Sequence, residues 1–441
     1  MLYLVLFATL AVGFYAATTI NTQIARNEKG LQQAQVAADG GMQFIRYQIS
    51  KSSFALAKPA KQMDVVAAQL GQQLNGTANM NGYTVQNSGG TIYIPAPNQW
   101  ITIDPTTGAR FRAVLTQSGN NLVVTVTGAG TNTTLKRAVQ LQFQQNALTG
   151  SIFSYGVASK SPITLGGNAA INGATSAGQG SVLIATAASS GLTLSGSPSI
   201  SGDYSYTNPN LVNSFGSGSI AGYTSASSSF GQHVHSGVAM PNFPYVDPTV
   251  YSQYAVNPYV PGSTLLANVT LPPGTYTLSN VNIQGVLYVQ SPCNLTIGGK
   301  SIIQGVIVTD ANPTVGNLTT NVISLSGQVA VKPIGTLPAT FPAGELSLTN
   351  AFLLAPYYTV NMSGQFGTIN GSIIASQMSM SGNASATVQG SIINIADSSM
   401  SLSGNAAITI VGNGASSAPA GINYGCNYTV QQGSYLEVTP Q

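Results

Sequence analysis

The sequence contains very little charge. Only 5% of its 441 residues are Asp, Glu, Lys or Arg, against roughly a quarter in an average soluble protein. A disordered chain would have the opposite composition, with much charge and few apolar residues. The net charge is only +3, and no arginine follows Arg137. The larger part of the chain therefore lacks the basic groove that a nucleic acid would need.

Side chains that carry catalysis are equally scarce. Beyond Lys160 every carboxylate stands alone, with no D-x-D or similar pair, whereas polysaccharide lyases and hydrolases need several carboxylates on one face. No motif for nucleotide binding or for a nucleophilic serine survives inspection. We therefore expect no enzyme activity and no cofactor. The isolated acids are Asp203, Asp247, Asp310, Glu345, Asp397 and Glu437.

Histidine occurs only twice, in the segment Q-H-V-H-S. In a strand, this spacing places His233 and His235 on one face, where they could bind a metal with Asp203 or Asp247 as a third ligand. No glutamate or cysteine flanks the pair. We therefore favour two exposed loop histidines over a metal site.

The two cysteines, Cys293 and Cys426, are far apart and match no metal-binding spacing. One interpretation is a disulfide that closes the C-terminal segment onto the preceding repeats, in an oxidising compartment. The other is two unpaired thiols, each behaving as a small hydrophobe. The sequence leaves both open.

A long uncharged segment begins the chain and extends to Ala25. About twenty apolar residues in a helix, at a rise of about 1.5 Å each, span a bilayer core. No basic residue precedes the segment, as one would in a secretory signal. We expect its apolar side chains to contact lipid or neighbouring helices. The residues are Met1, Leu2, Leu4, Val5, Leu6, Phe7, Leu10, Val12 and Phe14.

The helical pattern continues beyond this segment. Apolar or small residues recur at steps of three and four, while the charged residues take other faces. We expect one stalk helix over residues 1–59, ended by Pro59. The apolar stripe consists of Leu31, Ala34, Ala38, Gly41, Met42, Ile45 and Ile49.

This N-terminal region resembles a known family. Its apolar start, the polar break near QIARNEKG and the Ala-rich stretch ending in QVAADGG are similar to the first helix of type IV pilin-like proteins, in particular minor pilins of the PilX type. The resemblance covers residues 1–55. It implies that Met1 follows a glycine removed by a prepilin peptidase. It also implies that the helix lies in the inner membrane before assembly and then packs with other pilin subunits.

One position departs from the family pattern. Major pilins carry a glutamate where Val5 stands, so the resemblance favours a minor or tip subunit over the main subunit. The alternative is a plain single-pass anchor whose start codon is mis-assigned. For residues 60–148, a short helix followed by alternating runs predicts a small antiparallel α+β head of the pilin type.

Internal repeats dominate residues 149–414. Segments such as LTLSGSPSISGD and MSLSGNAAITI share one template of alternating apolar residues followed by Ser, Gly and Asn. Such repeats predict a right-handed parallel β-helix, a β-solenoid with glycine or asparagine at its corners. The template lapses at about 205–270, where we expect a long excursion. We expect residues 415–441 to cap the last coil. The predicted fold class is α+β, mainly β.

These features together predict a structural protein. The first hypothesis is a subunit of a type IV pilus-like surface filament, whose β-solenoid projects for adhesion, with surface polysaccharide as a candidate partner. Before assembly it would be anchored in the inner membrane. The second hypothesis is a membrane-anchored carbohydrate-active β-helix protein, which would need a carboxylate cluster on one solenoid face.

Overall fold

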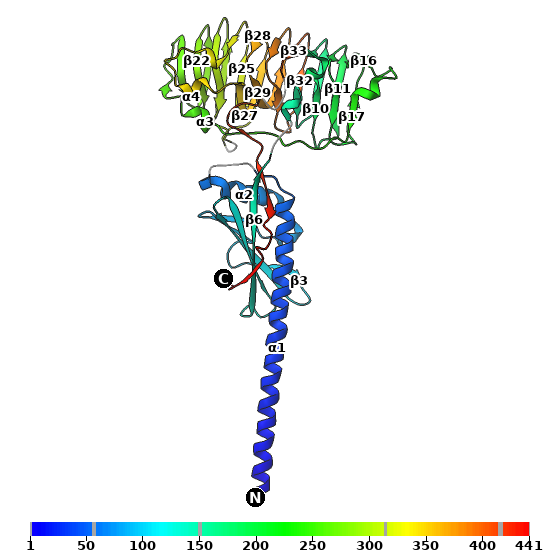
Figure 1. The fold of residues 1–441 in the computed structure, drawn as a ribbon, viewed down its shortest axis with the longest axis vertical. Helices are drawn as coiled ribbons and strands as arrows, with labels where there is room; N and C mark the ends of the chain where they lie inside the picture. Colours follow the sequence, from blue (N-terminus) through cyan, green and yellow to red (C-terminus); the bar gives the residue numbers. More distant parts are fainter. Residues whose placement is uncertain (1, 55–58, 149–151, 313–314, 413–417, 441) are drawn as a thin grey trace. The chain divides into compact units, whose positions relative to one another are not determined.

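The computed structural model describes residues 2–54, 59–148, 152–312, 315–412 and 418–440. The chain divides into two compact units: unit 1 comprises residues 1–148 and 425–441, and unit 2 comprises residues 149–424. Unit 1 consists of a long helix beside a small sheet, whereas unit 2 consists mainly of short strands (Figure 1). The chain thus has a long N-terminal helix and a large, mostly β body with parallel sheets.

Helix α1 spans Leu2–Ser50. Its buried residues follow the predicted steps of three and four, which confirms the apolar stripe in the second half of the helix. Leu31 is only half-buried, and Ala37 joins the stripe. The buried residues are Ala34, Ala37, Ala38, Gly41, Met42, Ile45 and Ile49.

The predicted end of the helix at Pro59 is wrong. The hydroxyls of Ser50 and Ser52 donate to the carbonyls of Tyr47 and Gln48 at 2.9 and 2.7 Å, contacts that compete with the helical backbone bonds. Pro59 instead begins α2 (Pro59–Leu74), a position that suits proline because the first N–H groups of a helix have no partner within it. A 3₁₀ turn, η1 (Ala78–Met80), follows.

The sheet of unit 1 is antiparallel throughout and has the order β1-β2-β4-β5-β6-β35, with β3 on β4 and β36 on β6. Alternate side chains of β4 and β5 enter one core with the stripe of α1. The bounds are β1 (Gln86–Ser88), β2 (Thr91–Ile94), β3 (Ile101–Asp104), β4 (Ala109–Ser118), β5 (Asn121–Ala129), β6 (Lys136–Ala147), β35 (Cys426–Val430) and β36 (Leu436–Val438).

Two glycines bring α1 onto this sheet. A Cβ atom at Gly128 in β5 would collide with the carbonyl oxygen of Ala34 and the amide nitrogen of Ala38. A Cβ atom at Gly41 would come within 2.5 Å of the Phe111 ring. The helix backbone therefore packs directly against the strands because neither glycine has a side chain.

The prediction that residues 415–441 cap the last coil is wrong for residues 425–441, because β35 and β36 belong to unit 1; residues 415–417 lie outside the described residues. Cys426 in β35 pairs with Ala147 in β6, and Glu437 in β36 pairs with Val139. These strands cover an edge of β6 that would otherwise be open, which removes unpaired backbone groups. Unit 2 is consequently an insertion between two neighbouring antiparallel strands of unit 1.

Unit 2 contains a 19-stranded sheet, a seven-stranded sheet and a small pair, β18 (Tyr245–Val246) with β34 (Ile422–Asn423). Pairing in the two larger sheets is parallel, except between β15 and β16. The 19-stranded sheet consists of β7 (Val157–Ser159), β8 (Ile163–Gly167), β10 (Val182–Ile184), β11 (Ser190–Gly196), β13 (Tyr204–Tyr206), β14 (Val212–Ser214), β17 (Val234–Ser236), β19 (Asn257–Pro258), β20 (Leu265–Leu271), β21 (Gly274–Ser279), β22 (Asn282–Val289), β23 (Cys293–Gly298), β24 (Ile302–Thr309), β25 (Val322–Leu325), β26 (Ala330–Lys332), β27 (Ala351–Met362), β29 (Ser372–Met380), β31 (Ile392–Asn394) and β32 (Met400–Leu402).

The seven-stranded sheet is formed by further short strands of the same repeats. Unit 2 also contains short helices between its strands: η2 (Ile152–Ser154), η3 (Ala177–Gly180), η4 (Phe230–His233), α3 (Thr249–Ser252), η5 (Ile334–Thr336) and α4 (Ala343–Leu346). The strands of this sheet are β9 (Ala170–Gly173), β12 (Ser199–Ile200), β15 (Ser219–Ile220), β16 (Tyr223–Thr224), β28 (Gln365–Ile369), β30 (Ser385–Val388) and β33 (Ala407–Ile410).

The strands do not stack in the order of the sequence. From β7 the first run proceeds through β10 and β13 to β17. The second run proceeds from β20 through β22, β24, β27 and β29 to β31, which pairs with β7. The chain therefore enters in the middle of the stack, winds to one end, crosses over, and returns from the other end (Figure 1).

The two runs meet at a seam. At this seam β31, β32 and β33 pair with β7, β8 and β9. The side-chain amide of Asn394, which is buried, donates to Ser159 Oγ at 3.1 Å, Ser161 Oγ at 2.6 Å and the Ser398 carbonyl at 2.7 Å. Both polar side chains and backbone pairs therefore join parts of the chain more than 200 residues apart.

The predicted excursion at 205–270 is too long. Strands β13, β14, β15 and β17 still pair in parallel, with β10, β11, β12 and β13 respectively, as far as Ser236. The template lapses because aromatic residues fill this end of the core: Tyr204 and Phe230 each pack edge-on against Phe215, at 6.3 and 4.9 Å. Within this segment, two stretches leave the parallel stack: the one between β15 and β17, which includes the antiparallel β16 and η4, and the one from residue 237 to β19, which includes α3.

Candidate functional sites

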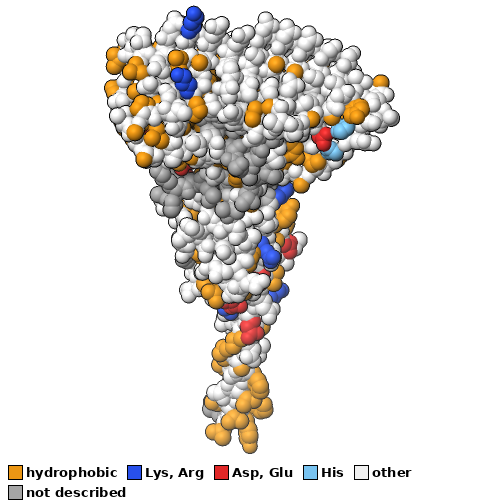
Figure 2. Space-filling view, turned by 45° about the horizontal axis from the view of Figure 1, so that its top comes forward, with side chains coloured by type: hydrophobic (Ala, Val, Ile, Leu, Met, Phe, Trp, Pro, Cys, Tyr) orange, Lys and Arg blue, Asp and Glu red, His pale blue; other side chains and the backbone are white. Residues whose placement is uncertain are grey.

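The first half of α1 is an exposed apolar surface. All the described residues that the sequence analysis assigned to lipid or filament contact are more than half exposed, from Leu10 at 54% to Leu2 at 82%. Met1 lies outside the described residues. Apolar side chains cover this end of the helix in Figure 2, and α1 is long and apolar enough to cross a membrane by length and composition. A contiguous apolar surface of this kind marks an interaction site.

The threonine hydroxyls within this segment donate hydrogen bonds to backbone carbonyls of the same helix. Thr9 donates to the carbonyl of Val5 at 3.1 Å, and Thr18 and Thr22 donate to the residues four before them at 2.8 Å. Thr19 does the same with Tyr15. A hydroxyl bonded to its own helix needs no water, so it is tolerated in lipid or between packed helices. Sequence reasoning missed this feature, although a threonine inside a predicted helix commonly bonds the carbonyl four residues before it.

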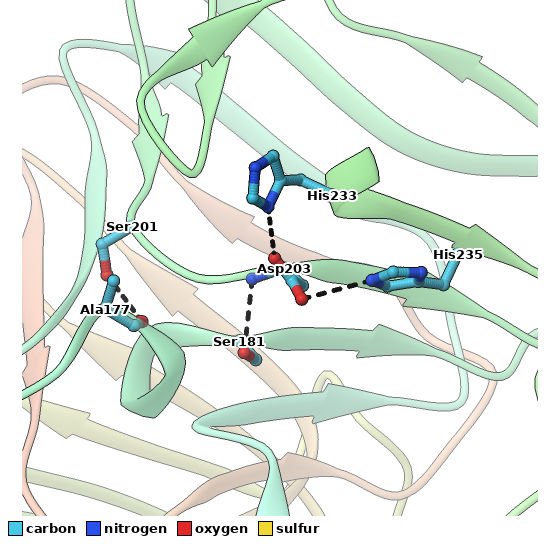
Figure 3. Close-up of polar contacts among 6 residues, drawn as sticks. All are labelled: Ala177, Ser181, Ser201, Asp203, His233 and His235. Atoms are coloured by element: carbon cyan, nitrogen blue, oxygen red, sulfur yellow. Dashed lines mark hydrogen bonds and ion pairs between the residues drawn. The ribbon is translucent and has the colours of Figure 1, made fainter. Parts of the chain in front are cut away.

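The two histidines share one carboxylate. His233 Nδ1 lies 2.8 Å from Asp203 Oδ1, and His235 Nε2 lies 3.2 Å from Asp203 Oδ2, so the rings approach the carboxylate from two sides (Figure 3). Tyr223 stacks on His233 with centroids 5.1 Å apart. The serine hydroxyl of Ser181 accepts from the Asp203 backbone N–H at 3.3 Å. The cluster joins residues at or next to three neighbouring parallel strands, β10, β13 and β17.

The surroundings of Asp203 favour the ionised form of its carboxyl group. Partial burial raises the pKa of Asp203, but the hydrogen bonds from His233 and His235 and their charges together hold it below its usual value. The other acid considered as a third metal ligand, Asp247, instead accepts from the Thr249 backbone N–H and hydroxyl. Among the described residues, no group of three or more His, Cys, Asp or Glu is arranged to hold a metal ion.

One carboxyl is fully buried in unit 2. Glu345 in α4 accepts a hydrogen bond from the Asn268 side chain at 2.9 Å through Oε2, while its Oε1 has no hydrogen-bond partner among the described residues. Burial raises the pKa of Glu345, and the bond from Asn268 opposes this shift. Oε1 lies against the backbone of Gly285, where a Cβ atom would not fit. No pattern in the sequence around Glu345 indicates that this acid is internal.

Of the two interpretations that the sequence left open for the cysteines, the structure has free thiols: Cys293 and Cys426 are both buried and unbonded. Cys293 belongs to the core of unit 2 and Cys426 to the core of unit 1. Burial, together with the nearby charge of Asp310, raises the pKa of Cys293 to about 11. Burial also raises the pKa of Cys426. Each thiol therefore acts as a small hydrophobe, the second of the two interpretations.

No protein-family model and no curated protein matches the sequence. Among solved structures, the competence-associated pilin ComZ from Thermus thermophilus is similar over 93% of this chain and 98% of that chain, with 11% identity and a TM-score of 0.24. The DUF3494 domain of Shewanella frigidimarina ice-binding protein_1 is similar over 61% of this chain and 99% of that chain, with 13% identity and a TM-score of 0.21. At such TM-scores neither similarity carries an argument about function.

Proposed function

We propose that the chain is a subunit of a type IV pilus-like surface filament, held by α1. The observation that carries this proposal is the division of α1 into two halves. The first half is uncharged and exposed, and its threonine hydroxyls donate to carbonyls of the same helix. In the second half, the buried stripe packs against an antiparallel sheet. A plain membrane anchor needs the first half alone.

The finer assignment is a minor or tip subunit of the PilX type. Val5, which is 63% exposed, offers no carboxylate to a neighbouring helix, which is the reason for favouring a minor subunit. Its partners are other pilin subunits through residues 2–24, and the inner membrane before assembly. It would work at the cell surface, in the filament, without a catalytic role.

Unit 2 is, in this proposal, a parallel β-solenoid that acts in adhesion. Its parallel rungs, its shared core and its asparagine ladder support this assignment: Asn168 Nδ2 bonds Asn405 Oδ1, and Asn405 Nδ2 bonds Asn383 Oδ1, both at 3.1 Å. Because unit 2 is inserted between β6 and β35, two strands of unit 1 connect to it. A load on the solenoid would be shared between two chain segments.

A helix exchange tests the filament role. Residues 2–24 are replaced by a Leu/Ala transmembrane sequence of equal length, and a Leu4→Ile variant serves as the control. The exchanged chain should remain in membranes but disappear from sheared surface filaments, while Leu4→Ile should appear in both fractions. Equal recovery of the exchanged chain in filaments would refute the proposal. Membrane retention of the unaltered chain without any filament fraction would favour the anchored carbohydrate-active protein.

A further inference from the structure

A row of hydroxyl and amide side chains crosses the 19-stranded sheet of unit 2. Thr164 shows the pattern: it is exposed between Ile163 and Leu165, which are buried in the core. Eight further strands place a Ser, Thr or Asn at the equivalent position, each in register with the next. The row runs Ser214, Thr193, Thr164, Ser401, Ser379, Asn361, Ser324, Thr296, Thr277.

The row is long and open to solvent. Its nine residues are exposed or half-buried, and neighbouring strands lie about 4.8 Å apart, so it extends for roughly 38 Å. Thr164 of the first run and Ser401 of the second are register partners at the seam. The row is therefore continuous only because the two runs of the chain meet. Within it, Ser401 Oγ donates to Ser379 Oγ at 3.3 Å.

A second row follows two residues further along, inside or one residue beyond the ends of these strands. Backbone bonds such as Ser403 N to Met380 O and Ser381 N to Met362 O continue the pairing of the strands into this stretch and keep its residues aligned. Gly166 and Gly298 interrupt the row between its serines. The serines of the row are Ser195, Ser403, Ser381, Ser363, Ser326 and Ser279, all exposed or half-buried.

Neither row contains a charged side chain. Charged side chains are also few on the face of unit 2 that Figure 2 displays. Every hydroxyl in the rows can both donate and accept a hydrogen bond, and Asn361 adds an amide with both capacities. A polyanion would find no cations here, and an apolar partner would leave the hydroxyls unpaired. The complementary partner is an uncharged polymer that carries many hydroxyl groups.

We propose that these two rows form the binding surface of unit 2 for a neutral polysaccharide that lies along them. The inference deepens the proposed adhesive role and rests on it only for its biological setting. The rows are irregular: serine and threonine carry their oxygen on Cβ, Asn361 carries its amide one atom further out, and Gly166 and Gly298 leave gaps in the second row. A rigid crystal of water would need a regular array of hydroxyls, whereas the hydroxyls of a sugar rotate and its chain bends. Many individually modest hydrogen bonds then act together over the row.

The experiment uses the full chain in detergent and a panel of insoluble neutral polysaccharides: cellulose, chitin, mannan and starch. The test variant is Ser324→Glu with Ser401→Glu. Its two carboxylates lie three strands apart in the first row, and a polymer bound along the row would cover both of them. The control is Ser199→Glu with Thr387→Glu, equally half-exposed residues of the seven-stranded sheet. Each variant is compared with the unaltered chain in co-sedimentation and in growth-rate measurements on single ice crystals.

The unaltered chain and the control should sediment with at least one of the four polysaccharides, and the test variant should bind it about tenfold more weakly or not at all. Equal binding by the test variant would overturn the proposal, because another surface would then be responsible. Absence of binding to all four would also overturn it, and ice-growth inhibition that only the test variant loses would assign the rows to ice. Filament incorporation is scored separately, so failure here leaves the filament proposal standing.

Discussion

The packing of α1 on its sheet can be tested with two adjacent glycines. Gly40 is exposed, and a Cβ atom there would lie 3.4 Å from Ile103 Cδ1, an ordinary contact. Gly41 is buried, and its Cβ atom would lie 2.5 Å from Cγ and Cδ2 of Phe111. Phe111 is itself held edge-on by Phe44 at 5.8 Å. Replacing each glycine by alanine therefore changes helix propensity equally and packing very differently.

The expected magnitudes follow from these contacts. Alanine in place of glycine favours a helix by about 1 kcal/mol, so Gly40→Ala should stabilise unit 1 by up to that amount. Gly41→Ala gains the same term but adds about 1–3 kcal/mol of overpacking against Phe111. The difference between the two variants should be about 1–3 kcal/mol, which for a unit of this size corresponds to roughly 2–12 °C in the unfolding midpoint.

The unfolding of unit 1 can be followed by the fluorescence of Trp100. It is the only tryptophan in the chain and belongs to unit 1, so its fluorescence follows the unfolding of that unit alone. Thermal melts of the full chain in detergent would be recorded for both variants. Equal midpoints for Gly40→Ala and Gly41→Ala would refute the account of how α1 meets the sheet.

Four further outcomes are expected. Asn394→Ala should lower the stability of unit 2 by about 2–4 kcal/mol, seen by circular dichroism, because it leaves the hydroxyls at the seam without their donor; no change would contradict the seam. The pKa of Glu345 is raised in the fold, so unit 2 should lose stability as the pH rises above about 4.3, and Glu345→Gln should remove this loss. The pKa of Asp203 is lowered, so its contribution should be present above about pH 3.9 and disappear as the pH falls further; a melt of Asp203→Asn with the same acid dependence would count against it. Alkylation of the denatured, unreduced chain should label both Cys293 and Cys426; a chain that takes up no label would restore the disulfide.

Some features of the fold were predictable because one physical rule decides them locally. The spacing of Ala34, Met42 and Ile45 determines which face of α1 meets the sheet, since residues three and four apart share a face. The alternation in segments such as ITLGG predicts strands with one buried side, and this side is the core of unit 2.

The stacking order was not predictable in the same way. Most of the repeats carry nearly the same template, so the pattern that makes Leu165 pair with Leu402 would equally allow other neighbours. The C-terminal strand posed the same problem, because Cys426, Tyr428 and Val430 alternate as well against one sheet as against another. The pairing with β6 depends on which edge remains open after the rest of unit 1 has folded.

The His–Asp cluster was partly predictable. Asp203 was considered as a neighbour of His233 and His235, but the segment was expected to leave the stack. The structure instead keeps β13 and β17 in register, with Ser205 opposite His235. Recognising one rung of about thirty residues, closed by aromatic rather than aliphatic core residues, would have placed the three side chains together.

The proposed role of α1 is to pack in the core of a filament. Surface filaments sheared from the native host would be imaged by cryo-electron microscopy, after mass spectrometry has shown this chain in the preparation. We expect density for residues 2–24 among the helices of the filament core, with no lipid around them. Recovery of the chain only from detergent-extracted membranes, with filaments free of it, would contradict the claim.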